Sequence, residues 1–327
     1  MVNGQVGLCK GTVQAVGINT NWIDAMAIYQ ATKTLLAIEE CIRADQGSSF
    51  RGWLGKVIPH IGDAYRQNDD PFRSHMGASQ IGNDCPRQIW YGFRWAMAPK
   101  FSGRALRLFN RGHLEEARFI AMLLMIGVKV YQQDEKGNQF RVSDAGGHFG
   151  GSGDGIAVGV PDLDPETQAL CEFKTANDKS FKAMKKSGVK ESKFEHYVQM
   201  NVYMRKMGIA VALYMVVNKN DDELYAELVP LDAEIADQYV NRGVKLVYAD
   251  VEPERINNSP GWYQCKWCDF RPVCHLGQKP ETNCRTCQYA NPMEDGTWKC
   301  KNFESDFYGT IDKQRQLLGC NKYRRKF

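Results

Sequence analysis

The distribution of cysteines is the feature that most constrains how this chain can fold. Seven of the eleven cysteines lie between residues 265 and 320. The first residues lack the basic, apolar and small-residue pattern of a secretory signal, so we expect a cytoplasmic protein. In a reducing compartment, clustered cysteines bind metal more often than they form disulfides. The C-terminal part is therefore expected to be held together by metal.

The clustered cysteines fall into two groups by spacing. The first, Cys265-x2-Cys268-x5-Cys274, offers three thiolates, which is one fewer than a closed metal site needs. Spacing alone does not identify the fourth ligand of this group.

The second group has the spacing of a zinc ribbon, Cys284-x2-Cys287-x12-Cys300. Cys320 is the best candidate for the fourth zinc ligand, and His275 is an alternative. The competing interpretation is that these cysteines are free thiols in a loosely ordered tail.

The order of hydrophobic patterns predicts an α/β fold, with a mixed sheet flanked by helices and a Cys-rich C-terminal segment. We expect three parts: residues 1–48 as an N-terminal helical segment of unassigned role, 49–279 as the α/β core, and 280–327 as a zinc-binding module. The longest apolar run, 119–130, is too short to span a membrane. The expected helices are 22–44 (capped by Asn21), 102–125, 193–206 and 232–248, and the expected strands are 128–132, 139–142, 155–160, 169–175, 210–217 and 224–229.

Charge permits a nucleic-acid partner without requiring one, because the net charge is only +4. Lysines gather between residues 174 and 193, and basic residues between 322 and 326. On charge alone, a solvated surface and a frayed tail are the preferred interpretation, and a groove that follows a phosphate backbone needs other support.

Two acidic residues and one lysine form the candidate catalytic pattern. On the expected strand 169–175, alternation places Glu172 and Lys174 on the same face. Upstream, glycines on both sides of Asp154 allow a tight turn at the start of a neighbouring strand. If that strand pairs with 169–175, Asp154 lies beside Glu172, and the two carboxylates form a site for Mg²⁺ or Mn²⁺.

These motifs resemble those of a known nuclease superfamily. Gly-x-Gly-Asp-Gly at 151–155, with Glu-Phe-Lys following at 172–174, resembles the PD-(D/E)xK signature. Gly112-x-x-x-Glu116 resembles the motif of phage and YqaJ-type exonucleases, whereas RecB-like members usually carry a histidine there; His113 is a weaker candidate. Gln199-x-x-x-Tyr203 resembles a motif of the RecB-like branch. The similarity covers residues 70–275 and implies a restriction-endonuclease-like core.

The resemblance implies a role for each matching residue. Glu116, Asp154 and Glu172 would hold Mg²⁺ or Mn²⁺, together with the Phe173 carbonyl. Lys174 would orient the attacking water or offset transition-state charge. Gln199 and Tyr203 would position the DNA strand and support the site. The products would carry a 5′-phosphate and a 3′-hydroxyl.

The resemblance also implies the missing thiolate. RecB-like iron–sulfur nucleases, such as AddB and the CRISPR-associated RecB-like exonucleases, have one cysteine before the nuclease core and three after it. Cys85, in Asp-Cys-Pro-Arg at 84–87, occupies the upstream position. A structural 4Fe–4S cluster on Cys85, Cys265, Cys268 and Cys274 is thus implied, with Trp262, Trp267 and Phe270 shielding it. A zinc ion in the same thiolates is the alternative.

The leading functional hypothesis is a DNA exonuclease in recombination, repair or end processing, of phage or prophage type. A structure-specific or single-strand endonuclease would use the same residues. A non-catalytic DNA-binding protein with structural metals is an alternative of another class, and an iron–sulfur redox protein lacks any nucleotide-binding loop to support it. No helicase motor is recognisable, so an unwinding or recombination partner would be a separate chain. Oligomers are possible.

Overall fold

The computed structural model describes residues 27–62, 65 and 72–327. Contacts divide the chain into two compact units. Unit 1 contains 101–142, 152–236 and the described residues up to 62 and 65, and unit 2 contains 72–100, 143–151 and 237–327. Each unit is assembled from several separate segments of the sequence, whereas the three parts expected from the sequence follow one another. The boundaries expected at residues 48 and 279 stay a prediction.

Unit 1 is built on a mixed six-stranded sheet, in the order β1-β9-β8-β7-β6-β3. Only the central pair, β7 and β8, is parallel. A parallel pair needs a crossover, and two helices, α5 and α6, provide it. The strands are β1 (Tyr29–Gln30), β3 (Lys129–Tyr131), β6 (Gly155–Val158), β7 (Gln168–Ala176), β8 (Val211–Asn218) and β9 (Leu224–Pro230).

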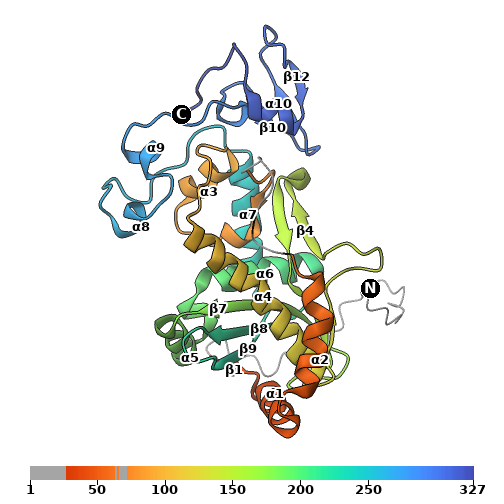
Figure 1. The fold of residues 1–327 in the computed structure, drawn as a ribbon. Helices are drawn as coiled ribbons and strands as arrows, with labels where there is room; N and C mark the ends of the chain where they lie inside the picture. Colours follow the sequence, from red (N-terminus) through yellow and green to blue (C-terminus); the bar gives the residue numbers. More distant parts are fainter. Residues whose placement is uncertain (1–26, 63–64, 66–71) are drawn as a thin grey trace. The chain divides into compact units, whose positions relative to one another are not determined.

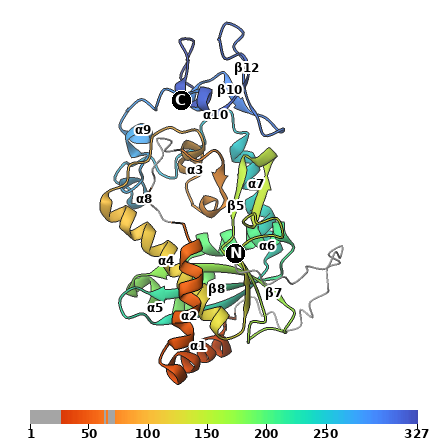
Figure 2. The same cartoon turned by 45° about the vertical axis from the view of Figure 1, so that its right-hand side comes forward.

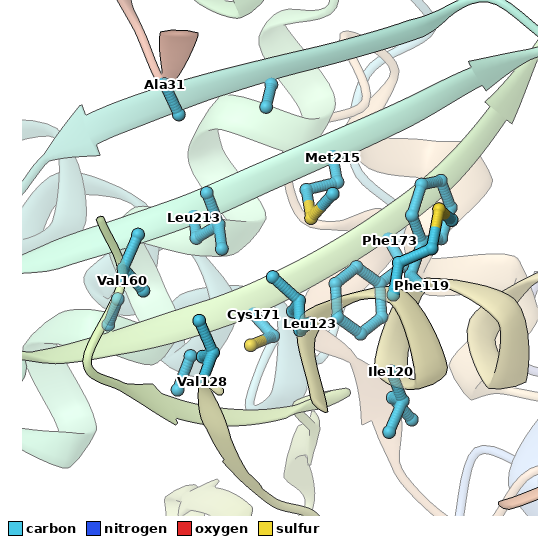
Figure 3. Close-up of a cluster of buried hydrophobic side chains, with 14 of the residues drawn as sticks. Ala31, Phe119, Ile120, Leu123, Val128, Val160, Cys171, Phe173, Leu213 and Met215 are labelled. Carbon is cyan, nitrogen blue, oxygen red and sulfur yellow. The ribbon is translucent and has the colours of Figure 1, made fainter. Parts of the chain in front are cut away.

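Helices cover both faces of this sheet (Figure 1, Figure 2). Side chains of β7, β8 and β9 alternate between the faces, and one set packs with helical residues into the main core. In that core, Phe119 stacks on Phe173 at 5.2 Å, and Cys171, Leu213 and Met215 continue the same face (Figure 3). The helices of unit 1 are α1 (Thr32–Asp45), α2 (Ser48–Val57), α4 (Gly103–Met125), α5 (Asp178–Ser192) and α6 (Phe194–Met207), and α7 (Ala233–Val247) begins there.

The α/β class and the mixed sheet flanked by helices are confirmed, with a correction at the N-terminus. A continuous helix over 22–44 is wrong for the described residues, because Tyr29 and Gln30 pair with β9 as an edge strand. Asn21 and residues 22–26 lie outside the described residues. The helix starts at Thr32, where the carboxylate of Asp162 accepts the backbone N–H groups of Lys33 and Thr34. This cap comes from a distant turn, so local sequence could not reveal it.

The lysine-rich segment before residue 193 is helical, although its charge alone gave no indication of a regular structure. It forms α5, which the sequence analysis did not predict, with Asn177 as its N-cap. Phe181 and Met184 are buried under the sheet, and several lysines point outward. The charge run is therefore the solvent face of an amphipathic helix.

Unit 2 is smaller and contains all eight cysteines of the two predicted metal sites. Two buried arginines bond to backbone carbonyls inside it: Arg285 donates to the carbonyls of Phe93 and Ser74, and Arg94 to that of Ala290. Its elements are β2 (Met76–Gly77), α3 (Pro86–Phe93), β4 (Arg141–Asp144), β5 (Phe149–Ser152), most of α7, α8 (Tyr263–Lys266), α9 (Arg271–His275), β10 (Ala290–Pro292), β11 (Trp298–Cys300), β12 (Gly309–Ile311) and α10 (Lys313–Leu318).

No helix within the described ranges has the length and apolar character needed to cross a membrane.

Candidate active site and cysteine groups

The predicted acidic residues come together on unit 1, at β7 and the turn before β6. Antiparallel pairing aligns Gly155 with Cys171, so the register places Asp154 next to Glu172. Asp154 Oδ2 accepts the Phe173 backbone N–H at 2.8 Å. In a β-strand the N–H and C=O of one residue point to the same edge. The Phe173 carbonyl therefore faces the Asp154 side, where the predicted metal ligand is needed.

Glu172 is fully buried, and both of its carboxylate oxygens have partners. Lys174 Nζ donates to Oε1, and Gln199 Nε2 donates to Oε2 at 3.0 Å. Burial raises the pKa of Glu172, and the nearby Asp154 charge adds to this effect, while Lys174 opposes it. Burial alone would lower the pKa of Lys174, but the surrounding carboxylates raise it overall. Lys174 therefore remains an ammonium ion.

Glu116 of α4 faces the same group of charges. Burial raises its pKa to about 8, and the Asp154 charge contributes. Its neighbour Glu115 is more buried but pairs with Arg118. His113 is exposed. Three carboxylates so close to one ammonium repel each other, which is the electrostatic situation that a divalent cation relieves.

Gln199 and Tyr203 lie one turn apart on α6, and Gln199 donates to the Glu172 carboxylate. Tyr203 is 2% exposed. Its ring lies 4.0 Å from the position of a Cβ on Gly153, directly behind the turn that carries Asp154. Tyr203 therefore supports the turn rather than offering a surface to a ligand.

Sequence reasoning missed a pair of residues beside the site. His196 Nδ1 lies 2.7 Å from the Tyr214 hydroxyl. Burial, with the Lys174 charge as a second cause, lowers the pKa of His196 to about 3. Tyr214 is the partner of Glu172 in the β7–β8 register. The position of His196 one turn before Gln199 was the available signal.

The four cysteines of the first predicted group line a single pocket of unit 2. Cys85 precedes α3, Cys265 lies in α8, Cys268 follows the end of α8, and Cys274 lies in α9. Burial raises the pKa of Cys268 to about 11, and the Cys85 and Cys274 thiols contribute. Phe270 lines the pocket, whereas Trp262 and Trp267, which are 42% and 79% exposed, are not among its lining residues, and their shielding role stays a prediction.

Cationic side chains surround this pocket. Arg87, Arg255 and Arg271 line it together with His275. Four thiolates that hold a metal centre keep two to three negative charges in total. The positive charges of these arginines would compensate that remainder. The donor set and its surroundings therefore fit an anionic metal–thiolate centre.

The second predicted group also converges. Cys284, Cys287, Cys300 and Cys320 line another pocket of unit 2, whereas His275 belongs to the first. Burial raises the pKa of Cys284 to about 12, with the other three thiols adding to it. Of the two candidate fourth ligands, the fold places Cys320 with the other three. No set of three His, Cys, Asp or Glu side chains in the described part of the chain is already arranged for coordination, so neither the two cysteine groups nor the carboxylates of unit 1 form a finished metal site.

Comparisons with known proteins add little beyond a weak structural similarity. No protein-family profile matches the sequence, and no curated protein matches it. A crystal structure of SSO0001 is 14% identical with a TM-score of 0.38, covering 72% of this chain and 98% of that one. LHK-Exo, an alkaline exonuclease from Laribacter hongkongensis, is 17% identical with a TM-score of 0.37, covering 53% of this chain and 86% of its own. A second LHK-Exo structure, in complex with dAMP, is 16% identical with a TM-score of 0.38, covering 53% and 86%. Similarities this weak assign no activity to the chain.

Proposed function

We propose that this protein is a metal-dependent DNA nuclease that acts as an exonuclease at DNA ends. The observation that carries the proposal is the group formed by Asp154, Glu172, Glu116 and Lys174 on unit 1. A buried Glu172 bonded to both Lys174 and Gln199 is costly to maintain for stability alone. Such costs are typical of active sites.

Asp154, Glu172, Glu116 and the Phe173 carbonyl offer the oxygen ligands that Mg²⁺ or Mn²⁺ prefers. When bound, the metal ion supplies Lewis-acid chemistry, which lowers the pKa of water and neutralises phosphoryl charge. The roles of the chain follow from its own contacts. Gln199 holds the Glu172 carboxylate in orientation, and the Phe173 N–H does the same for Asp154.

Lys174 has a role that its charge state defines. Its Nζ donates to the Glu172 carboxylate, which places its positive charge beside the residues that would hold the metal. It donates hydrogen bonds, which orient the attacking water and offset the negative charge that develops on the phosphoryl oxygens. A DNA exonuclease and an endonuclease would use this arrangement identically, so their distinction depends on substrate access.

The experiment that tests the proposed function compares linear and circular DNA. Purified full-length protein is incubated with Mn²⁺ and either end-labelled linear DNA or covalently closed circles. Loss of linear DNA with intact circles supports an exonuclease, and cleavage of circles supports the endonuclease alternative. No cleavage of either substrate, with DNA binding retained, supports the non-catalytic binding protein and overturns the proposal.

We propose that both cysteine groups are structural metal centres. The first would hold a 4Fe–4S cluster and the second a zinc ion, on the eight cysteines that line the two pockets of unit 2. Cys85 and Cys274 are far apart in sequence, so a cluster between them would tie distant segments of unit 2 together. Anaerobic purification with iron, sulfide and zinc analysis separates this assignment from two zinc ions.

A further inference from the structure

The N-terminal half of α4 has an open face next to Glu116. Helical periodicity places Gly112 and Phe109 on nearly the same side as Glu116, since they lie four and seven residues before it. A Cβ added at Gly112 would meet no atom within 4 Å. Packing therefore gives no reason for a glycine in the interior of this helix, where glycine costs about 1 kcal/mol relative to alanine.

Aromatic side chains continue this face away from the catalytic group. Phe101 and Phe109 contact each other edge to face, with ring centroids 5.1 Å apart. They are 43% and 42% exposed, so both rings are accessible. Phe109 precedes Glu116 by seven residues, which is about 10 Å along the helix axis.

The same segment is basic. Residues 100–114 contain four Lys or Arg residues and no Asp or Glu. Arg104 and Arg107 have no carboxylate partner among the described residues, and Arg111 donates only to the Lys219 carbonyl. Helical periodicity places Arg104, Arg107 and Arg111 roughly 140–160° around α4 from Phe109, so their charge does not mark the face that carries Phe109 and Gly112. That face offers a single strand the exposed aromatic pair, because bases stack on such rings.

We propose that a single DNA strand runs along this face of α4, with its backbone against Gly112 and a base stacked on the Phe101–Phe109 pair. The absence of a side chain at Gly112 lets the phosphodiester backbone approach the helix beside Glu116. The aromatic pair lies about three base steps from Glu116, at the ~3.4 Å spacing of stacked bases. This inference rests on the proposed nuclease function, and it assigns where the strand enters.

The test compares Gly112→Leu and Phe109→Ala in the full chain with the wild type. Affinity for a fluorescent single-stranded oligonucleotide is measured by fluorescence anisotropy, with Ca²⁺ in place of Mn²⁺. Gly112→Leu removes a helix-interior glycine without a clash, so the melting temperature rises while affinity falls at least about tenfold. Phe109→Ala weakens binding roughly fivefold or more, as expected for the loss of one stacking contact. A rise in stability combined with a loss of affinity is not expected from a merely structural residue.

Two matched controls accompany these variants. Leu108→Ala removes a side chain that is 47% exposed on the same helix but points about 100° away from Phe109. Gly52→Leu in α2 likewise meets open space. Both controls keep wild-type affinity, and Gly52→Leu also gains stability.

The outcomes separate the inference from the proposed function. If the wild type cleaves DNA and both α4 variants bind as it does, the inference is overturned and the nuclease proposal stands. If the wild type neither binds nor cleaves DNA, both are overturned. A change in oligomeric state of Phe109→Ala, with DNA affinity unchanged, would show that this face contacts a second copy of the chain instead.

Discussion

At the residue scale, the proposed cleavage depends on the charged side chains around Glu172. Lys174→Ala removes the ammonium ion that is bonded to the buried Glu172 carboxylate. We expect cleavage to fall by at least about 10²-fold, since a charged donor to the transition state is lost. DNA binding in Ca²⁺ and the melting temperature change little.

The matched control for this prediction is Lys182→Ala. Lys182 is also paired with a carboxylate, that of Asp178, but is 74% exposed. Its loss leaves cleavage unchanged. Cleavage by Lys174→Ala at the wild-type rate would disprove the role assigned to Lys174.

A buried residue outside the site, Glu227, makes the stability of the fold depend on pH. Glu227 is buried, and its Oε2 accepts hydrogen bonds from the Tyr225 hydroxyl and the Val189 N–H. Burial raises the pKa of Glu227. A carboxyl whose pKa is raised on folding stabilises the fold below its unfolded pKa, and this contribution is lost as pH rises through the folded pKa.

Glu227→Gln keeps an oxygen for both donors but removes the charge. We expect a higher melting temperature than the wild type at pH 8 and no advantage at pH 4. Thermal melts across this range test it. A difference that is constant with pH would show that the charge of Glu227 is not the cause.

At the element scale, β6 sets the position of Asp154. A Cβ on Gly155 would lie 2.9 Å from the Tyr131 carbonyl oxygen of β3. Gly155→Ala therefore forces β6 away from β3 and moves the adjacent Asp154. We expect cleavage to fall roughly 10²-fold, because active sites tolerate displacements of only about 1 Å. Kinetic assays with Mn²⁺ measure the loss.

Gly159→Ala at the other end of β6 is the comparison for this prediction. Its Cβ would meet no atom within 4 Å, although its φ of +83° makes the substitution strained. It is expected to lower stability without a comparable loss of cleavage. If both variants lose cleavage equally, the effect is one of folding and not of Asp154 placement.

At the scale of the whole molecule, unit 2 depends on its cysteines. Its small aromatic core around Trp90 and Tyr91 gives limited hydrophobic stabilisation, as is usual for small segments. Cys268→Ser should lose iron and the brown colour, and the melting temperature should fall, because a thiolate ligand is removed.

Cys41→Ser is the control, because Cys41 is a free cysteine outside both pockets. It keeps the wild-type iron and zinc content. A stable, brown Cys268→Ser protein would mean that Cys268 is not a cluster ligand. Unchanged zinc content in Cys320→Ser would likewise remove Cys320 from the second group.

Local patterns determined much of the fold in advance. Ser102 starts α4 where the sequence placed it, and the strands at 155–158, 168–176, 211–218 and 224–230 follow from their apolar runs. The alternation that put Glu172 and Lys174 on one face also held. Side-chain periodicity and capping are properties of neighbouring residues, so they can be read without the fold.

Contacts between distant segments were decided only by the tertiary structure. The sequence could not show that Asp162 caps α1, that Tyr29 and Gln30 join the sheet edge, or that Gln199 reaches Glu172. The sequence favoured Cys320 over His275 for the second cysteine group, and only the fold brings Cys320 beside the other three cysteines. Each of these contacts joins residues whose separation in space is set by packing, which no local pattern encodes.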